Sequence, residues 1–354
     1  MAGKRFACED LLEKLIALPT PGTNEDAGQK LVMKALRPLC DRMETDIYGD
    51  VLGVVNEKAP TRVLLAAHVD EIGLMVSNVD DRGFVQVNLM GGSRPDALVG
   101  QRMHVHTAKG PVLGVVGRKP GEAPKEQIKT EDLYLDIGAT NRAEAAALVR
   151  PGDTVTCVCG LDRLSGDRVT GRGLDDRAGV AAVIRAMEII RKERRRLKVA
   201  VYGLSNVQEE GGRFRGAAVS AFRIMPQAAI AVDVCYARDF PKMETRLSGD
   251  CKLSGGPTLS LSLTVNRVVN RMLEAAAEAR NIPLQYAVEP TATGTDGDAI
   301  ATIGPGVATG VVSIPCRYVH SPSEVISLAD LDRTAELVAE FVLRLPAKPD
   351  FRPI

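Results

Sequence analysis

The sequence contains no tryptophan, and aromatic residues make up only 4% of its 354 residues. A core must therefore be built from aliphatic side chains, which the hydrophobic content of 45% supplies. An excess of charge of either sign is also missing, because Lys plus Arg and Asp plus Glu both number 45. This balance argues against nucleic acid or a membrane surface as a partner recognised through bulk charge.

Long apolar runs are absent as well, so no segment approaches a membrane span and residues 1–15 do not resemble a signal peptide. The seven cysteines are scattered except for Cys157 and Cys159, whose spacing lacks the two-residue gap of a zinc knuckle or a redox pair. We therefore expect reduced, buried thiols and a cytoplasmic location.

The chain contains two different patterns of predicted secondary structure. Residues 1–72 and 167–354 alternate apolar, β-branched strands with helices such as 267–280, which predicts one discontinuous α/β domain. Residues 73–166 instead hold short strands, turn residues such as the hairpin signal at 80–83, and few helices. We expect this middle stretch to be an inserted β domain, either a small barrel or a sandwich.

A pair of acids marks the first candidate site. The apolar segment 197–205 predicts a buried parallel strand, and Glu209 and Glu210 lie on the loop that follows it. Ligands bind at this end of the strands in open α/β sheets. Two carboxylates this close repel each other unless a positive group lies beside them. Taken alone, the pair is more simply interpreted as a solvated turn. Whether it belongs to a functional site depends on the residues at the other strand ends.

Four other predicted strands also lead into side chains that can bind metals. The strand 62–70 ends in His68 and Asp70, which point the same way because they lie two residues apart. A carboxylate commonly holds the second nitrogen of a histidine ligand, so this pair can supply a ligand and its support. The other strand ends lead to Asp175, which could equally be a helix N-cap, Asp233 and His320. The remaining histidines, His104 and His106, lie on a separate predicted strand and are interpreted as ordinary strand residues.

Five motifs now carry a resemblance to a known family. They are AAHVDEIG, GRGLDDRAG, QEEGG, AVDV and YVHSPSE, in this order along nearly the whole chain. The set resembles the TET aminopeptidases, metallopeptidase family forty-two, which includes glutamyl aminopeptidases and proteins once labelled cellulase M. The resemblance implies a mixed sheet sandwiched by helices, as in the zinc exopeptidases, with residues 73–166 serving oligomerisation and access to the site. It also implies a tetrahedral dodecamer, with the dimer as building block.

The resemblance further implies a site for two divalent metal ions. Asp175 would bridge the ions, of which one would also bind His68 and Asp233 and the other Glu210 and His320. These ligands include no thiolate and suit zinc first, with cobalt or manganese as alternatives.

The expected reaction is the removal of N-terminal residues from short peptides. Glu209 would be the general base that takes a proton from water and passes it to the leaving amine. Asp70 would orient His68. In this clan a cis peptide precedes the second residue of the Asp-Asp pair, so we expect one between Asp175 and Asp176.

Two features depart from the family pattern. The run QEEGGRFRGA is one residue longer than usual after the glutamates, and residues 119–122 stand where many members have a histidine. The preferred N-terminal residue of the substrate stays open, with Arg213, Arg215 and Arg317 as candidate selectors of an acidic residue.

Other functions stay open too. A carboxypeptidase or deacylase of the same clan would use the same metals, although an insertion after His68 favours the TET family. A glycosidase needs two carboxylates about 5 to 9.5 Å apart that face one cavity, whereas adjacent residues of an extended segment point to opposite sides. A non-enzymatic scaffold stabilised by metal would be favoured if Glu209 were absent.

Overall fold

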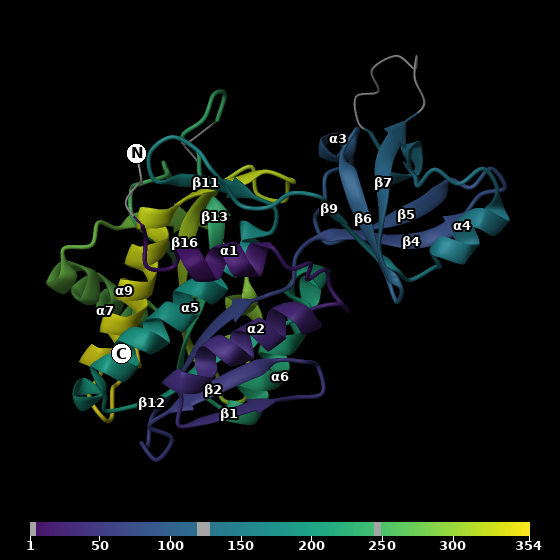
Figure 1. Ribbon diagram of the computed structural model, residues 1–354. Helices are drawn as coiled ribbons and strands as arrows, with labels where there is room; N and C mark the ends of the chain where they lie inside the picture. Colours follow the sequence, from purple (N-terminus) through teal and green to yellow (C-terminus); the bar gives the residue numbers. More distant parts are fainter. Residues whose placement is uncertain (1–4, 119–127, 244–248) are drawn as a thin grey trace.

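The computed structural model describes residues 5–118, 128–243 and 249–354. Figure 1 shows a large α/β body with a smaller β body beside it, which the chain enters after β3 and leaves before β11. The segment 119–122, where the family histidine is missing, lies outside the described residues. No helix in the described ranges is long and apolar enough to cross a membrane.

The large body is built on one mixed sheet of eleven strands. Nine of them follow the order β1-β2-β12-β3-β13-β16-β17-β11-β10, while β14 pairs with β15 and β16. The bounds are β1 (Arg42–Thr45), β2 (Val51–Val55), β3 (Arg62–His68), β10 (Asp162–Arg163), β11 (Arg168–Gly171), β12 (Ala200–Asn206), β13 (Ala228–Tyr236), β14 (Thr258–Leu261), β15 (Gln285–Val288), β16 (Ala308–Arg317) and β17 (Glu324–Ser327). The central strands β12, β3, β13 and β16 run parallel, so their carboxyl ends meet at one edge of the sheet.

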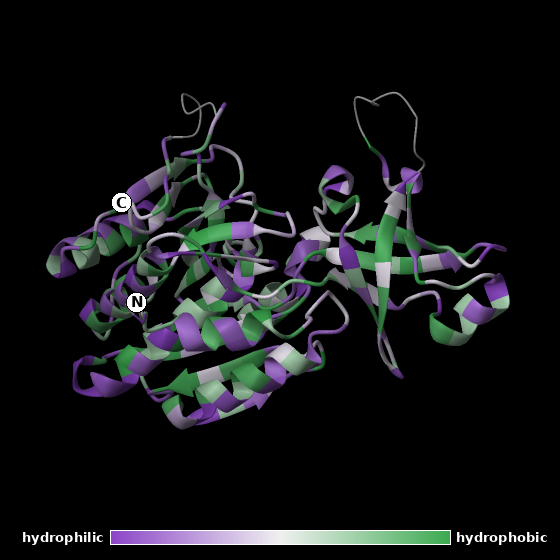
Figure 2. Ribbon diagram, turned by 45° about the horizontal axis from the view of Figure 1, so that its top comes forward, coloured by the Kyte–Doolittle hydropathy of each residue, from purple (hydrophilic) through white to green (hydrophobic). Residues whose placement is uncertain are grey.

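Helices cover both faces of this sheet because alternate residues of its strands are apolar on both sides. Val63 and Leu65 of β3 belong to the core under α1, α2, α5, α7 and α9, whereas Leu64 belongs to the core under α6 and α8. Figure 2 shows mostly hydrophobic strands between helices of mixed character. The helices are α1 (Glu9–Ile16), α2 (Asp26–Leu36), α5 (Leu174–Lys192), α6 (Arg215–Ile224), α7 (Arg267–Arg280), α8 (Asp296–Ile300) and α9 (Leu328–Arg344), with short 3-10 turns at Arg37–Leu39 and Arg194–Arg196. A third 3-10 turn, Thr130–Asp132, precedes β8 in the smaller body.

The smaller body is a closed barrel with its own aliphatic core. Its strands follow the order β4-β5-β8-β7-β6-β9, which decides between the barrel and the sandwich. The bounds are β4 (Gly73–Val79), β5 (Val85–Met90), β6 (Arg102–Thr107), β7 (Gly110–Arg118), β8 (Leu133–Asp136) and β9 (Thr154–Cys157), with helices α3 (Pro95–Leu98) and α4 (Arg142–Leu148). His104 and His106 lie on β6, where the Nε2 atom of His106 is 2.8 Å from the hydroxyl of Thr156. Burial lowers the pKa of His106 to about 4, as suits a neutral strand residue.

Candidate active site

The carboxyl edge of the parallel strands gathers all seven predicted site residues. His68 is the last residue of β3 and pairs in register with Asn206, the last residue of β12. Asp233 lies inside β13, whereas the sequence predicted it at the end of a strand, because β13 continues to Tyr236. The other predicted residues come from the connections that follow β3, β12 and β16 and from the start of α5, and they are Asp70, Asp175, Glu209, Glu210 and His320.

The carboxylate of Asp175 lies between two imidazoles. Its Oδ1 atom is 3.4 Å from Nε2 of His68, and its Oδ2 atom is 3.3 Å from Nε2 of His320. Glu210 Oε2 lies 3.4 Å from the same nitrogen of His320, while Asp233 Oδ1 lies 4.0 Å from Nε2 of His68. The two histidines therefore face the two oxygens of one carboxylate.

Asp70 connects the strand that carries His68 with the loop that carries the glutamates. Its carboxylate oxygens accept the backbone N–H groups of Glu209 and Glu210, each at 3.1 Å. His68 Nδ1 lies 3.1 Å from the backbone carbonyl of Asp70 and 3.6 Å from its Oδ1 atom. Asp70 thus reaches the histidine chiefly through its carbonyl, and its carboxylate holds the loop.

The loop after β12 contains a π-helical turn, Glu209–Arg213. A π turn holds one residue more than an α-helical turn, which suits the additional residue noted in QEEGGRFRGA. Glu209 Oε2 lies 3.7 Å from Nε2 of His68, and the side chain is buried. Glu209 and Glu210 therefore face one site although they are neighbours in sequence.

A cis peptide bond joins Asp175 to Asp176, as expected. Asp176 Oδ1 accepts the N–H of Gly179 at 2.9 Å, so the helix cap is Asp176 and Asp175 is left to face the histidines. Gly179 must be glycine, because a Cβ atom there would lie 2.3 Å from Asp176 Oδ1. Glu324 supports Asp175 and His320 from behind, since its carboxylate accepts the N–H of Asp175 at 3.2 Å and that of His320 at 2.9 Å.

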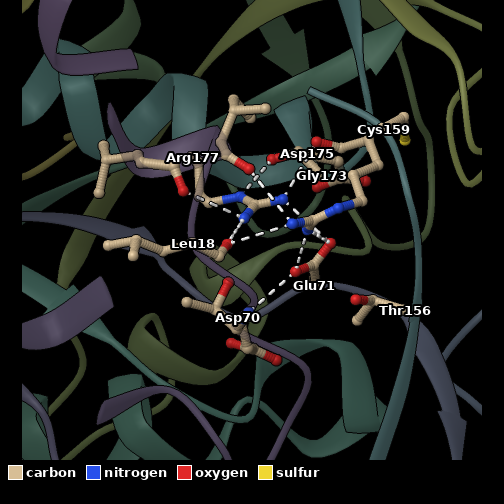
Figure 3. Close-up of polar contacts among 12 residues, drawn as sticks. Leu18, Asp70, Glu71, Thr156, Cys159, Gly173, Asp175 and Arg177 are labelled. Atoms are coloured by element: carbon tan, nitrogen blue, oxygen red, sulfur yellow. Dashed lines mark hydrogen bonds and ion pairs between the residues drawn. The ribbon is translucent and has the colours of Figure 1, made fainter. Parts of the chain in front are cut away.

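A buried ion-pair cluster braces the segment that leads into Asp175. Figure 3 shows Glu71 facing the guanidinium of Arg177, whose Nη2 lies 3.0 Å from Oε2 of Glu71. Arg172 contacts the same carboxylate. Arg177 also donates to the carbonyls of Gly173 at 2.8 Å and Leu18 at 2.7 Å. Gly173 has a φ of +58° and leaves no space for a Cβ atom, which would lie 1.8 Å from Arg177 Nη2.

The barrel also reaches this site. Gly91 and Gly92 follow β5, and a Cβ atom on Gly92 would lie 2.2 Å from Nδ1 of His320. A Cβ atom on Gly91 would lie 3.3 Å from Oε2 of Glu210. These two glycines let the barrel backbone lie directly against the histidine and the glutamate.

The gathered carboxylates strongly perturb one another. Burial raises the pKa of Glu209 to about 10, although His68 opposes this shift. Burial also raises the pKa of Glu210 and of Asp233, and repulsion from Asp175 adds to both shifts. For Asp175 itself burial opposes ionisation, but the two histidines hold its pKa below the usual range. So many acids in one buried place require compensating positive charge.

The donor set fits divalent metal ions. Glu210 Oε1 is buried and has no hydrogen-bond partner in the described part of the chain. His68, Asp175 and Glu210 offer atoms within 4.8 Å of one another, and so do His68, Asp176 and Asp233. Imidazole nitrogens and carboxylate oxygens are ligands for zinc and for manganese or cobalt.

A cavity of about 330 Å³ opens onto these candidate ligands. Its described lining includes no lysine or arginine, so it contains none of the three arginines considered as acidic-residue selectors. Arg317 is instead paired with Asp239, with 2.6 Å between Nη2 and Oδ2. We call the five candidate metal ligands together with Glu209 the ligand cluster. The rest of the wall includes Phe214, Tyr236, Glu289, Thr293 and Val319.

The sequence did not predict the residues that support the candidate ligands from behind, which are Glu71, Arg172, Asp176, Arg177 and Glu324. All five lie in or beside the quoted motifs and are nearly or fully buried. A charged residue inside an otherwise apolar run is the one signal that indicates such a role. Arg177, which begins the apolar stretch of α5, carries that signal most clearly.

The chain is similar to known peptidases along nearly its whole length. The profile of the M42 glutamyl aminopeptidase family matches residues 49–337. The lysyl aminopeptidase of Pyrococcus furiosus is 33% identical over 353 residues, which cover 97% of this chain and 99% of that protein. An aminopeptidase structure from the archaeon Desulfurococcus kamchatkensis has a TM-score of 0.90 and 33% identity, covering 96% of this chain and 95% of that one. The TET1 peptidase of Pyrococcus horikoshii, which can assemble into a tetrahedron or a large octahedral shell, has a TM-score of 0.85 and 30% identity, with coverage of 96% and 100%.

These matches define the class, which is that of the aminopeptidase-type peptidases. The chain belongs to the M42 glutamyl aminopeptidase family. Its mixed sheet with a closed barrel is the fold of the TET aminopeptidase structures. The predicted fold class and the family resemblance are both confirmed.

Proposed function

We propose that the protein is a metal-dependent aminopeptidase that removes N-terminal residues from short peptides. The observation that carries the proposal is the position of Asp175 between His68 and His320, at a cavity that Glu209 also lines. A carboxypeptidase or deacylase of the same clan would use similar ligands, and membership of the M42 family favours the aminopeptidase.

Five side chains would hold two divalent ions, zinc first and cobalt or manganese as alternatives. Asp175 would be shared between the ions, one completed by His68 and Asp233 and the other by Glu210 and His320. Bound ions of this kind polarise a carbonyl and lower the pKa of water. Asp176 offers oxygens near His68 and Asp233 as well, but these oxygens accept backbone N–H groups of Gly179 and His68, so we assign the shared role to Asp175.

Glu209 would act as the general base. Its Oε2 atom would take a proton from the attacking water and deliver it to the amine nitrogen of the departing peptide. Asp70 would hold the backbone of both glutamates, so that Glu209 faces the substrate while Glu210 is directed toward His320. Each step uses a side chain that lines the cavity or directly supports one that does.

We further propose that residues 73–166 form an inserted domain, between the two parts 1–72 and 167–354 of the catalytic domain. Its described part includes the barrel and also β10, which pairs with β11 of the large sheet. Because Gly91 and Gly92 lie against the ligands, the inserted domain would limit access to the site.

We also propose a homo-oligomer, a tetrahedral dodecamer built from dimers, with the TET1 peptidase as precedent. Exposed apolar side chains cluster on and beside the paired strands β14 and β15, and they are Leu261, Leu263, Tyr286 and Val288. Light scattering should give a mass near twelve times 37.9 kDa at micromolar protein. The mass of a single chain would contradict this assembly.

The seven cysteines form no disulfide, which supports the cytoplasm as the place of action.

Hydrolysis of three forms of one tetrapeptide tests the proposed activity. With zinc, cobalt or manganese added, we expect cleavage of the free peptide and of its C-terminally amidated form. An N-acetylated form should resist cleavage, because an aminopeptidase requires the free amine. A chelator should abolish the reaction and added metal should restore it. Cleavage of the acetylated peptide, or undiminished cleavage by protein shown to be free of metal, would refute the proposal.

A further inference from the structure

Glu289 is the one charged residue of the described cavity wall outside the ligand cluster. It follows β15, where its backbone N–H donates to the carbonyl of Leu261 at 3.0 Å. Its Oε2 atom is buried and has no hydrogen-bond partner among the described residues. A buried carboxylate oxygen without a partner is costly and thus marks a place where a donor from a ligand would bind.

The described groups around Glu289 do not provide a hydrogen-bond donor for its Oε2 atom. Burial raises its pKa, and repulsion from Asp298 adds to the shift. The hydroxyl of Ser260 and the more weakly acting Arg238 oppose the shift without cancelling it. A cation that entered the cavity would therefore be attracted by Glu289 and would stabilise its ionised form.

The other charges of the cavity would cancel, so its net charge would be that of Glu289. Two divalent ions would bring four positive charges, and Asp175, Glu209, Glu210 and Asp233 would bring four negative ones. The ligand cluster would then be neutral as a whole. The negative charge of Glu289 would then decide that the cavity favours a cationic substrate group over an anionic one.

Substrate geometry determines which group meets that acid. The carbonyl to be attacked must lie at the ligand cluster, so the side chain of the N-terminal residue extends toward the rest of the wall. This wall includes the apolar side chains of Phe214 and Val319 as well as the carboxylate of Glu289. Lysine and arginine match such a wall, because each has an apolar stem with a cationic end.

Building on the proposed aminopeptidase function, we propose that Glu289 selects substrates whose N-terminal residue is lysine or arginine. An acidic residue would be repelled by this carboxylate. A neutral apolar residue of the same length would cover Glu289 without giving it a donor, which lowers affinity for that substrate. Selection thus acts both by attraction and by exclusion.

Comparison of lysyl and norleucyl chromogenic substrates tests the assignment, because norleucine matches most of the lysine side chain but has no charge. The metal-loaded protein should show a kcat/KM roughly 10- to 100-fold higher for the lysyl substrate, the scale of one hydrogen bond to a charged group. Glu289→Gln should reduce this ratio to within about threefold of one, chiefly through a lower kcat/KM for the lysyl substrate. Glu289→Asp should keep part of the ratio, and Glu278→Gln, which removes an exposed acid of α7, should keep all of it.

Three results would overturn the assignment. Equal kcat/KM values for the two substrates in the unmodified protein would leave the aminopeptidase function intact and refute the selection. Equal losses on both substrates in Glu289→Gln, with metal content and melting temperature retained, would show that Glu289 binds the α-amine that both substrates share. Failure to hydrolyse any aminoacyl substrate would refute the aminopeptidase function, and the selection with it.

Discussion

The carboxylate of Asp70 accepts a hydrogen bond from the backbone N–H of Glu209 at 3.1 Å, across 139 positions of sequence. The second oxygen of Asp70 accepts the N–H of Glu210 at the same distance. Asp70 follows the strand that ends in His68, and it is fully buried. One carboxylate therefore fixes how the loop that carries the base lies relative to the strand that carries a ligand.

Asp70→Asn should weaken both the fold and the reaction. An amide has only one accepting oxygen, so the N–H of Glu209 or of Glu210 would face an NH₂ group. A buried donor left without an acceptor costs about 1–3 kcal/mol, and we expect this loss in the free energy of unfolding measured with urea. Turnover should fall as well, because the direction of Glu209 is no longer fixed. Asp162→Asn, at an exposed position of β10, serves as the control, with a change below about 0.5 kcal/mol. Unchanged stability and turnover in Asp70→Asn would contradict the account.

Arg177→Met should be among the most destabilising substitutions in the chain. It would leave Glu71 with Arg172 as its one cationic partner among the described residues and would remove donors from the carbonyls of Gly173 and Leu18. Removing one member of a buried ion pair costs about 3–5 kcal/mol. Urea unfolding should show a loss of this size.

The exposed Arg94 provides a matched control, because it also pairs with a nearby acid, Asp96. Arg94→Met should cost less than about 1 kcal/mol, since exposed ion pairs contribute little. Equal losses in Arg177→Met and Arg94→Met would show that the buried cluster does not brace the site.

Asp50 should make stability depend on pH. Burial raises its pKa from 3.8 to about 7, although the hydroxyl of Ser220 and the N–H of Val207 oppose this shift. Between these two pH values the folded protein holds a proton that the unfolded chain has released, so protonation stabilises the fold at low pH. This contribution is complete below pH 3.8 and is lost as the pH rises through 7.

Melting temperatures at pH 5 and pH 8.5 test this linkage. The unmodified protein should lose more stability between the two values than Asp50→Asn, which cannot release the proton. The difference between the two proteins isolates Asp50 from the other titrating groups. Parallel curves for the two proteins would mean that Asp50 is already ionised at pH 5.

The sequence predicted elements best where the local signals agreed. The helix predicted at 267–280 matches α7 residue for residue, because Asn266 caps it by accepting the N–H of Val268 and Val269. The residues at the ends of parallel strands were also predictable as a group, since such ends meet at one edge. The end of β13 was not predictable, because pairing with β16 carries the strand on to Tyr236.

The residues that support the candidate ligands could not be predicted from the sequence, for a physical reason. Glu71 and Arg177 lie 106 positions apart, and nothing local indicates that they meet. The helix cap posed a similar problem, because the sequence offered Asp175 as an N-cap. The N–H of Gly179 donates to Asp176, so Asp176 is the cap.

The most direct test of the central claim measures metal content and turnover in Glu209→Gln and Glu210→Gln together. Glu209→Gln should keep both metals and the fold while turnover falls by about 10²- to 10⁴-fold, because the amide cannot accept the proton. Glu210→Gln replaces an anionic ligand with a neutral one, so it should lose metal and regain part of its turnover when metal is added. Loss of metal from Glu209→Gln with retention in Glu210→Gln would reverse the two roles, and full turnover in both variants would contradict the account.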